Sequence, residues 1–507
     1  KNEFTKKQKL MIRNYLKTAW RSLRQSKTSA LINLSGLAVG MTAFLLIMYF
    51  VRYEMSFDAD ADSIYRVTVR QEENRETGMH SARTYAGIAP ALTQNLPQVE
   101  MAVRVLAEEC LLQYRPERKL FNNQKTYWAD AGFHQLFGLD FVLKGNLELL
   151  NRPHHAVMSI SAAKRFFGED WSLDKTPVGK TIWLNGSVPF MLQGVYKDLP
   201  ANSHLAADFI VSYNTLNSLI GPVMETAMPP RGNFAYNYVR LQAGADAGEV
   251  AAAMNEILIS KIPESSKQNL SFRFDLQPVK SIHLSSHLAD ELRPNGNAVL
   301  IYSLTGAALL ILIIAWINFI NLSTARAMER AKEVGVRKAL GADRKRLIGQ
   351  FMTEGFLYGM LAALLSLLLV FAVLRPFQTM TGISAPLFSM QNISLWGLFA
   401  GAVLLGGGLA SLYPAFVLSS FRPVKVLKGS SYAITQGGGL FRKLLIIFQF
   451  SAAILLLCCT GAVYFQANYM KSQHLGMDTG AVLVIHSPRS MIGNATRADV
   501  FKTFREE

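Results

Sequence analysis

The hydrophobic residues of this 507-residue chain are concentrated in five blocks that contain no Asp, Glu, Lys or Arg. The blocks are 20 to 25 residues long and lie at 29–51, 298–322, 355–374, 393–417 and 444–465. At a helical rise of about 1.5 Å per residue, each block can cross a hydrocarbon core of roughly 30 Å. The pattern therefore predicts a polytopic α-helical membrane protein with five spans.

A different pattern fills the interval 52–297, where short apolar runs alternate with polar residues and turns. Alternation of period two predicts strands at 64–70, 101–106, 181–185, 189–195, 236–241 and 271–277. Helical spacing predicts helices near 84–96, 131–138, 159–168 and 246–260. We therefore expect 52–297 to form a large extracytoplasmic α+β domain with two subdomains.

The net charge of +16 lies outside that domain. Segment 1–28 contains nine Lys and Arg and one acidic residue, 323–354 contains eight and four, and 418–443 contains five and none. Interval 52–297 contains 24 basic and 27 acidic residues. If the spans alternate in direction, the three basic segments share one side, which the positive-inside rule identifies as the cytoplasm. We therefore expect a cytoplasmic N-terminus, and the charge requires no nucleic-acid partner.

The two ends of the chain differ in pattern. Segment 1–28 has apolar residues at helical spacing with basic residues between them, which predicts a cytoplasmic amphipathic helix at the lipid headgroups. A plain topology signal is the alternative. At the other end, a basic run, a span, a linker and a strand repeat the order found at 21–70. We interpret 466–507 as the start of a second extracytoplasmic domain, and we expect the chain to be a truncated form of a longer protein.

The connector 323–354, between the second and third spans, contains helix start and stop signals. Gly341 fits the position that follows a helix C-terminus, and Asp343 fits the N-cap of the next helix. The pattern predicts a short amphipathic helix at about 326–340, with Val334 on its apolar face, and then a turn into the third span. A docking element for a soluble partner is one interpretation, and a loop that only sets topology is the other.

Motifs for catalysis or cofactor binding are weak in 52–297. Residues 174–181, DKTPVGKT, end like a phosphate-binding loop, but Asp174 stands where its first glycine is required and a strand is predicted next. No nucleophile elbow of the Gly-x-Ser-x-Gly type occurs in this interval. His283 and His287 are four residues apart, but the sequence HLSSH lacks the internal glutamate of a metalloprotease helix. Zinc needs three or four converging ligands, and the other histidines considered are His154, His155 and His204. We expect no catalytic site, metal or cofactor in this chain.

The string ERAKEVGVRKALGADRKRLIGQFMTEG at 329–355 resembles the cytoplasmic signature of FtsX-like/MacB-like permease subunits of ABC transporters. The segment NYLKTAWRSLRQSKTSALINLSGLAVG at 14–40 and the segment 177–209 resemble the same family. The chain is most similar to the two-repeat permeases of Bacteroidetes-type bacteria, which have eight spans and two exported domains. It departs from them by stopping after the fifth span.

The resemblance implies a non-catalytic permease subunit in a bacterial inner membrane, with 52–297 as a MacB-like periplasmic core domain. ATP and Mg would be held by a separate cytoplasmic ABC ATPase, and the connector helix would bind that ATPase. Matching positions are Arg330, Glu333, Val334, Gly335, Val336, Arg337, Lys338, Ala339, Leu340 and Gly341. Movement would pass through the second span into the periplasmic domain (mechanotransmission) to export or extract a substrate.

Further partners implied by the resemblance are membrane lipid, a second permease copy or pseudo-symmetric half, and a periplasmic substrate or partner protein. Two other functions stay open on the residues alone. One is a membrane-anchored sensor or adaptor whose exported domain binds a ligand and whose connector recruits a signalling protein. The other is an exported hydrolase, which would show activity in isolated 53–297.

Overall fold

The computed structural model describes residues 27–473 except for short internal segments. Those segments are 74–77, 145–149, 170, 172–175, 222–227, 230–233, 268–269, 341–342, 384, 390–391 and 421–438. Our predictions for 1–28, 418–443 and 466–507 therefore lie largely outside the described residues, as does Gly341. The chain divides into two compact units, one built on residues up to Tyr53 and from Val299 onward, the other on Glu54–Ala298. We call them the helical unit and the α+β unit.

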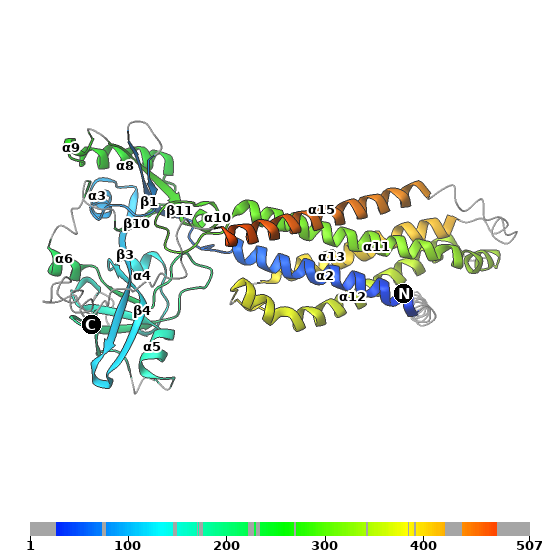
Figure 1. The fold of residues 1–507 in the computed structure, drawn as a ribbon, viewed down its shortest axis with the longest axis horizontal. Coiled ribbons are helices and arrows are strands. Elements are labelled where there is room, and N and C mark those ends of the chain that lie inside the picture. Colours follow the sequence, from blue (N-terminus) through cyan, green and yellow to red (C-terminus); the bar gives the residue numbers. More distant parts are fainter. Residues whose placement is uncertain are drawn as a thin grey trace, which may run out of the picture. The chain divides into compact units, whose positions relative to one another are not determined.

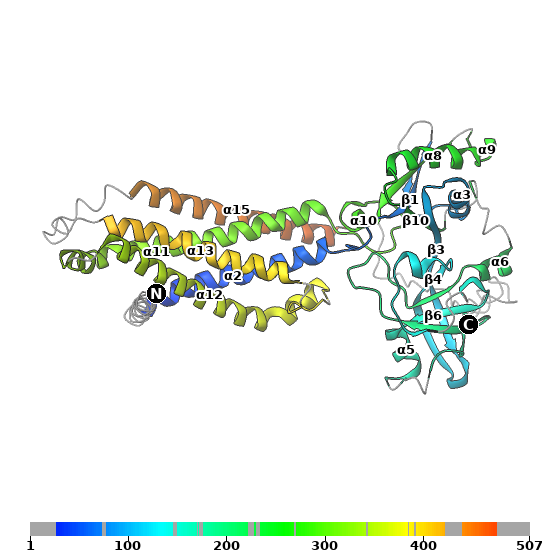
Figure 2. The same ribbon diagram turned by 180° about the vertical axis from the view of Figure 1, so that it is seen from behind.

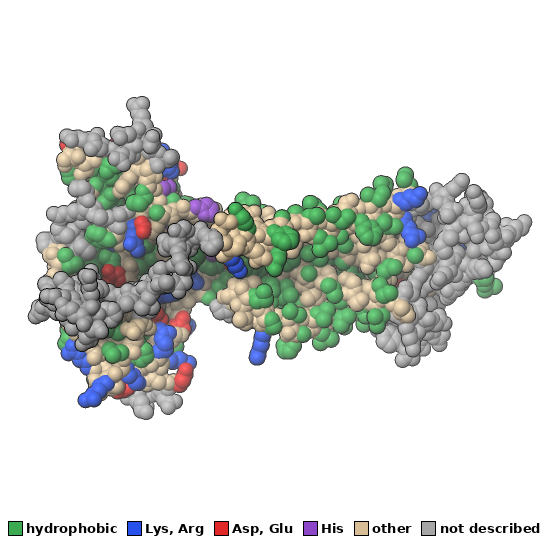
Figure 3. Space-filling view, in the orientation of Figure 1, with side chains coloured by type: hydrophobic (Ala, Val, Ile, Leu, Met, Phe, Trp, Pro, Cys, Tyr) green, Lys and Arg blue, Asp and Glu red, His purple; other side chains and the backbone are tan. Residues whose placement is uncertain are grey.

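The helical unit is a bundle of long helices that run side by side in both views of the ribbon (Figures 1 and 2). Its described helices are α2 (Lys27–Met55), α11 (Ala298–Ala339), α12 (Arg344–Thr381), α13 (Ile393–Ser420) and α15 (Gly439–Ser472). On the face shown in Figure 3, hydrophobic side chains are spread along the whole described length of the unit with few charged side chains among them, as expected for a surface that meets lipid.

Four described helices are long and apolar enough to cross a membrane: Ala30–Met55, Ala298–Ala325, Arg344–Thr381 and Leu440–Ser472. We predicted five spans, and the remaining one, 393–417, lies in α13. Among the described residues, the apolar stretch of α13 extends over Ile393–Leu409 and is shorter than the other four. The class of fold, a polytopic helical membrane protein with a large α+β domain, is confirmed.

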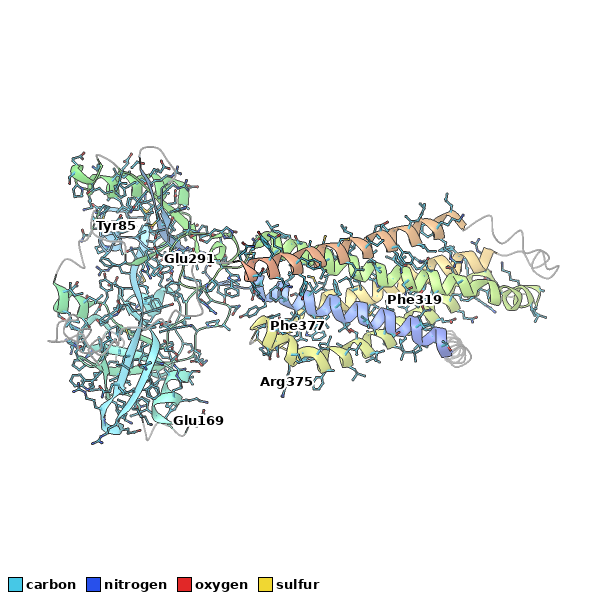
Figure 4. All side chains as sticks on the ribbon, viewed as in Figure 1. Tyr85, Glu169, Glu291, Phe319, Arg375 and Phe377 are labelled. Atoms are coloured by element: carbon cyan, nitrogen blue, oxygen red, sulfur yellow. The ribbon has the colours of Figure 1, made fainter. Side chains whose placement is uncertain are left out.

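Small residues allow α2 to approach α11 closely. A side chain at Gly40 would place its Cβ 2.6 Å from the Cβ of Ala315, so only glycine fits there. The hydroxyl of Thr42 lies 3.2 Å from that of Ser366, which joins α2 to α12. Phe319 of α11, labelled in Figure 4, meets the ring of Tyr358 of α12 with centroids 5.7 Å apart. Helix α2 is therefore enclosed by neighbours along much of its length.

The glycines of α13 do not all serve the same purpose. A Cβ at Gly406 would run into the indole of Trp316, and one at Gly407 would lie 3.3 Å from the ring of Phe356. At Gly397 and Gly401 no atom lies within 4 Å of the added Cβ. Among the described residues, close helix packing at the glycines of this span is thus found in its second half.

The α+β unit is built on one 11-stranded sheet with the order β11-β1-β10-β3-β4-β9-β6-β8-β5, while β2 pairs with β1 and β7 pairs with β3 and β8. The strands are β1 (Ile64–Glu73), β2 (His80–Ser81), β3 (Val99–Tyr114), β4 (Lys119–Ala129), β5 (Phe141–Lys144), β6 (His155–Ser159), β7 (Thr181–Leu184), β8 (Val188–Tyr196), β9 (Phe209–Ser212), β10 (Tyr236–Leu241) and β11 (Leu270–Pro278). Pairs β4·β9 and β6·β8 are parallel, and the other pairs are antiparallel.

Helices cover this sheet at both ends (Figure 1). They are α3 (Ile88–Asn95), α4 (Phe133–Leu136), α5 (Ile160–Phe167), α6 (Asn214–Ile220), α8 (Ala247–Ser260), α9 (Glu264–Lys267) and α10 (Val279–Ser285), with the 3₁₀ turn η1 (Arg115–Glu117). Local signals fix two helix starts: Ser159 accepts from the Ala162 amide, and Asp246 accepts from the amides of Gly248 and Glu249.

The α+β unit has separate hydrophobic clusters, but they lie on one continuous sheet and not in the two subdomains that we predicted. At one end, α3 and α8 pack on β1, β10 and β11 around Val67, Met254 and Phe274. At the other end, α5 packs on the far half of β3 and on β4, β6 and β8 around Phe166 and Leu192. A third cluster, around Val103 and Tyr238, lies between these two, and β3 contributes residues to all three. The unit therefore has three large hydrophobic clusters on one continuous sheet.

Candidate functional site

Helix α11 extends the second span into the connector without a break. It contains 42 residues, of which Ala298–Ala325 are apolar enough to cross a membrane. The remaining residues, 326–339, continue the same helix for about 20 Å at the helical rise of about 1.5 Å per residue. The helix that we predicted at 326–340 is present, but as the end of α11 and not as a separate short helix.

The chain turns at Leu340 and enters α12 two residues after the undescribed pair 341–342. Asp343 occupies the N-cap position of α12 with φ −68° and ψ 143°, as predicted, although its side chain makes no capping hydrogen bond. The amide of Leu340 donates to the carbonyl of Val336, 3.0 Å away, and closes the last turn of α11. The α12 helix then continues as one piece to Thr381.

The base of this turn is held by an apolar cluster. Val334 is 2% exposed and packs with Leu347 and Phe351 of α12 and with Ala415 of α13. Its position on the apolar face of the connector helix was predicted from the sequence. Because three helices meet at this cluster, the end of α11 and the beginning of α12 form one packed element.

Beyond the cluster, the turn exposes apolar and basic groups together. Leu340 is 82% exposed and Val336 is 48% exposed, and Ala339 is exposed as well. Arg344, Lys345 and Arg346 are exposed in the first turn of α12, which contains no acidic residue. Basic groups at a helix N-terminus are unfavourable next to the positive end of the helix dipole, by roughly 0.3–1 kcal/mol each. These three basic residues therefore destabilise the first turn of α12.

The structure describes the surroundings of only some of the predicted coupling residues. Lys338 is partly buried, and this burial together with the nearby charge of Arg344 lowers the pKa of its ammonium. The side chains of Arg330, Glu333 and Arg337, the surroundings of Gly335 and the whole of Gly341 lie outside what the structure describes. Arg344, Lys345 and Arg346 were not among the predicted site residues, although a basic run directly after an N-cap was visible in the sequence.

Histidines of the α+β unit have partners within the protein. His204 Nδ1 lies 2.9 Å from a carboxylate oxygen of Asp58, and its Nε2 lies 3.0 Å from the hydroxyl of Tyr238. His283 Nε2 lies 2.8 Å from Glu54, and His154 Nδ1 lies 3.0 Å from the carbonyl of Pro189. Within the described part of the chain, no group of three or more His, Cys, Asp or Glu is placed to hold a metal ion.

A buried charge that the sequence analysis did not identify lies in β1. Arg66 has no exposed surface and makes a two-pronged contact with Glu291, at 2.7 and 2.8 Å, while also donating to Gln277 at 2.7 Å. Burial by itself raises the pKa of the Glu291 carboxyl, but the hydrogen bonds and charge of Arg66, together with hydrogen bonds from Ser286 and Asn295, outweigh it and lower that pKa. The pair fastens the segment after α10 to the sheet.

Two protein-family models match the chain. The MacB-like periplasmic core domain matches residues 30–257, and the FtsX-like permease C-terminal region matches residues 305–423. The second match includes the end of α11, the turn at Leu340 and the start of α12. The exposed apolar and basic turn thus lies in the FtsX-like region of the chain.

Individual relatives agree with these matches. The chain is 26% identical over 289 residues to the macrolide export ATP-binding/permease protein MacB of Bdellovibrio bacteriovorus, covering 54% of this chain and 38% of that protein. It is 21% identical over 435 residues to the ABC transporter permease YvrN of Bacillus subtilis, covering 82% of this chain and 99% of that protein. The aligned part is thus less than half of the MacB protein and nearly all of YvrN.

Solved structures resemble the α+β part at a lower level. The crystal structure of the periplasmic region of MacB from Actinobacillus actinomycetemcomitans is 16% identical with a TM-score of 0.31, covering 45% of this chain and 95% of that one. A domain of a permease protein from Porphyromonas gingivalis is 20% identical with a TM-score of 0.38, covering 44% and 92%.

Proposed function

Because this chain is an FtsX/MacB-like permease of the ABC transporter family, we propose that it couples ATP hydrolysis by a separate ATPase subunit to movement of its periplasmic domain. The protein is a membrane protein with a periplasmic domain. In the proposal it lies in a bacterial inner membrane with its N-terminus and the turn at Leu340 in the cytoplasm. ATP and Mg bind to the partner ATPase, and this chain performs no chemistry.

The observation that supports this proposal most directly is the continuity of α11. One helix connects Ala298, which is the last residue of the α+β unit, to Ala339 beside the exposed turn. A separate connector helix joined by a flexible link could shift without affecting the span. A continuous helix transmits such a shift, because its backbone hydrogen bonds couple each turn to the next.

The chemistry of the turn fits a protein partner. Fully burying a leucine side chain is worth roughly 1.5–3 kcal/mol relative to leaving it exposed, so an 82% exposed Leu340 offers binding energy to a groove. Arg344, Lys345 and Arg346 would add electrostatic steering toward an acidic rim. The alternative, a loop that only sets topology, needs the basic charge but no exposed leucine. We therefore favour a docking element, with membrane lipid as a further neighbour.

The site residues keep the roles that the resemblance implies. Glu333, Arg337 and Lys338 contact the ATPase through their charges, and Gly335 allows its surface to approach. Arg330, Val336, Ala339, Leu340 and Gly341 complete the contact, while Val334 holds the helix in place from behind. In the proposed assembly a second permease copy or pseudo-symmetric half completes the transporter, which exports or extracts a periplasmic substrate or acts on a partner protein there.

The test is ATP turnover of the partner ATPase after reconstitution with the full chain in lipid. Arg337→Glu and Gly335→Trp are expected to abolish the stimulated turnover while membrane insertion is retained. Leu340→Ser is expected to lower affinity for the ATPase about tenfold, which corresponds to roughly 1.4 kcal/mol. Arg375→Glu is the matched control, because Arg375 is an exposed arginine toward the other end of α12.

Unchanged stimulated turnover in both Arg337→Glu and Gly335→Trp would reject the docking site. Purification in mild detergent provides an independent check. An ATPase that co-purifies with the chain supports transport, and a kinase or regulator in its place would favour the sensor or adaptor alternative.

A further inference from the structure

Three parts of the α+β unit that are far apart in sequence meet at His283. Glu54 lies in the last turn of α2, and its Oε2 is 2.8 Å from the imidazole Nε2 of His283 in α10. A carboxylate only accepts hydrogen bonds, so Nε2 carries the proton and donates it. The side chains are 15% and 9% exposed, which places this contact largely out of water. It ties the end of α2 to a helix 229 residues further along the chain.

Two further contacts hold His283, one at its ring and one at its backbone. The ring of Phe57 stacks on it with centroids 3.5 Å apart and an angle of 5° between the planes. The amide of Gly296 donates to the carbonyl of His283 at 2.8 Å. Gly296 lies two residues before α11 begins at Ala298. The group formed by Glu54, Phe57, His283 and Gly296 is called the His283 junction below.

The junction leaves no room for a side chain at Gly296. A Cβ there would lie 2.9 Å from Glu54 Oε2, 3.0 Å from His283 Nε2 and 3.1 Å from Leu284 Cδ2. Real Cβ atoms are rarely found this close to other atoms, so a side chain would push Glu54 and His283 apart. The chain that enters α11 therefore touches the same hydrogen-bonded group that holds the end of α2.

The base of the junction belongs to the core of the α+β unit. Val279 and Ile282, on the same short helix as His283, are 1% exposed and pack with Tyr236 and Tyr238 of β10. A second contact of the same kind follows in the chain, since Asp58 is bound to His204 and to the hydroxyl of Ser203, 2.7 Å away. Residues 54–58 are thus attached to the sheet at two points.

We propose that the His283 junction is the positioning site through which displacements of α2 and α11 enter the periplasmic domain. It holds Glu54, in the last turn of α2, and Gly296, just before α11, on one helix of the α+β unit, α10. Glu54, His283 and Gly296 are positioning residues. The proposal rests on the proposed function for the origin of the movement, but the attachment itself exists without an ATPase.

The attachment is tested by the distance between two spin labels on the full chain in lipid nanodiscs. Both labels are placed in the α+β unit, at Met55→Cys, which is 56% exposed at the end of α2, and at Leu219→Cys, which is 50% exposed on α6. Cys458 and Cys459, which are exposed, are replaced by serine in this background. Gly296→Ala and His283→Leu are expected to widen the distance distribution at least twofold. His283→Gln keeps a donor and is expected to restore the narrow distribution.

The matched control is Lys280→Leu, on the same helix, whose side chain pairs with exposed Asp62 in the segment between α2 and β1. It is expected to leave the distribution narrow. A distribution as narrow as the original in Gly296→Ala and His283→Leu would overturn the proposal. In the presence of the ATPase, the same two variants are expected to lower stimulated turnover about tenfold while the ATPase still binds. Widened distances with full stimulation would also overturn it.

The failure of the proposed function is distinguishable from the failure of this proposal. If the unmodified chain does not stimulate any ATPase, the coupling function is wrong. The spin-label distances then decide the attachment alone, because they require no partner.

Discussion

Val334 of α11 packs against Leu347 of α12, so the two helices that flank the exposed turn at Leu340 are joined just behind it. Two residues further along α11, Val336 is 48% exposed. One valine thus supports the turn and the next one is available to a partner. The same substitution at the two positions separates the two roles.

Val334→Asp is expected to detach the end of α11 from α12, because an unpaired carboxylate in an apolar cluster costs at least about 2 kcal/mol. Trypsin cleavage near Lys338 and Arg344 in the reconstituted chain should accelerate about tenfold or more. Val336→Asp should leave the cleavage rate within about twofold and still weaken ATPase binding. Equal cleavage rates in the two variants would contradict the assigned cluster.

Glu291→Ala is expected to destabilise the α+β unit by about 3–5 kcal/mol, since it leaves the fully buried guanidinium of Arg66 without its carboxylate. The measurement is the denaturant midpoint of the full chain in detergent, followed by near-ultraviolet circular dichroism. Lys197→Ala serves as the control, because its pair with Asp140 is exposed at 61% and 65%. That change should stay within about 0.5 kcal/mol.

The stability of the α+β unit is expected to fall in acid. In the folded state the pKa of Glu291 lies below its ordinary 4.5 and that of Asp58 below its ordinary 3.8. For Asp58, burial raises the pKa, but the hydrogen bonds and charge of His204, together with the hydrogen bond from Ser203, outweigh that effect. A carboxylate with a lowered folded pKa contributes stability above its unfolded pKa, and this contribution is lost as pH falls through the folded value.

Unfolding midpoints measured between about pH 3 and pH 7 should therefore be flat down to about pH 4.5 and decline below it. Asp58→Asn should make the decline shallower while lowering the plateau. A midpoint that rises as the pH falls through this window would show that the two carboxylates are not bound as described.

Gly355→Val is expected to disrupt the packing of α12 on α13, because a Cβ at Gly355 would collide with the hydroxyl of Ser411. Such overpacking costs about 1–3 kcal/mol. The temperature at which the purified protein aggregates in detergent should drop by several degrees. Gly397→Val, where no atom lies within 4 Å of the added Cβ, is the matched control and should show no such change. Equal behaviour of the two variants would argue against this helix contact.

Much of the fold follows from local sequence pattern. The apolar blocks coincide with long helices because a run without charges can satisfy its backbone only as a helix in lipid. The predicted strands at 236–241 and 271–277 match β10 and β11, since alternation reports directly on a half-buried strand. Helix 246–260 also begins at its capping aspartate, Asp246, as the pattern suggests.

The strand and the buried ion pair that were not predicted depend on residues that are distant in the chain. Strand β4 was not predicted because the run Asn122-Asn123-Gln124 interrupts the alternation of apolar and polar residues. Its extended conformation is stabilised by pairing with β3. Arg66 was taken as part of a simple alternating strand, which places a polar residue toward solvent. Its face of β1 is covered by residues 225 positions later, including Glu291. No local pattern predicts such a partner.

The candidate site divides in the same way. The helix, its apolar Val334 and the N-cap at Asp343 were readable from spacing, because each depends on residues a few positions apart. The exposure of Leu340 and the contact of Val334 with Ala415 depend on how three helices meet, which spacing does not specify. The contact between Glu54, His283 and Gly296 could likewise not be predicted, because Glu54 and His283 are 229 residues apart.

An uninterrupted α11 behaves as a stiff rod over its 42 residues. If its far end is pushed sideways, the rod pivots, and the pivot point decides how large the excursion is at Ala298. A proline introduced near the middle would act as a soft joint and absorb the tilt before it arrived. The described α11 contains no proline, so the length of the helix determines how far Ala298 moves when the far end is displaced.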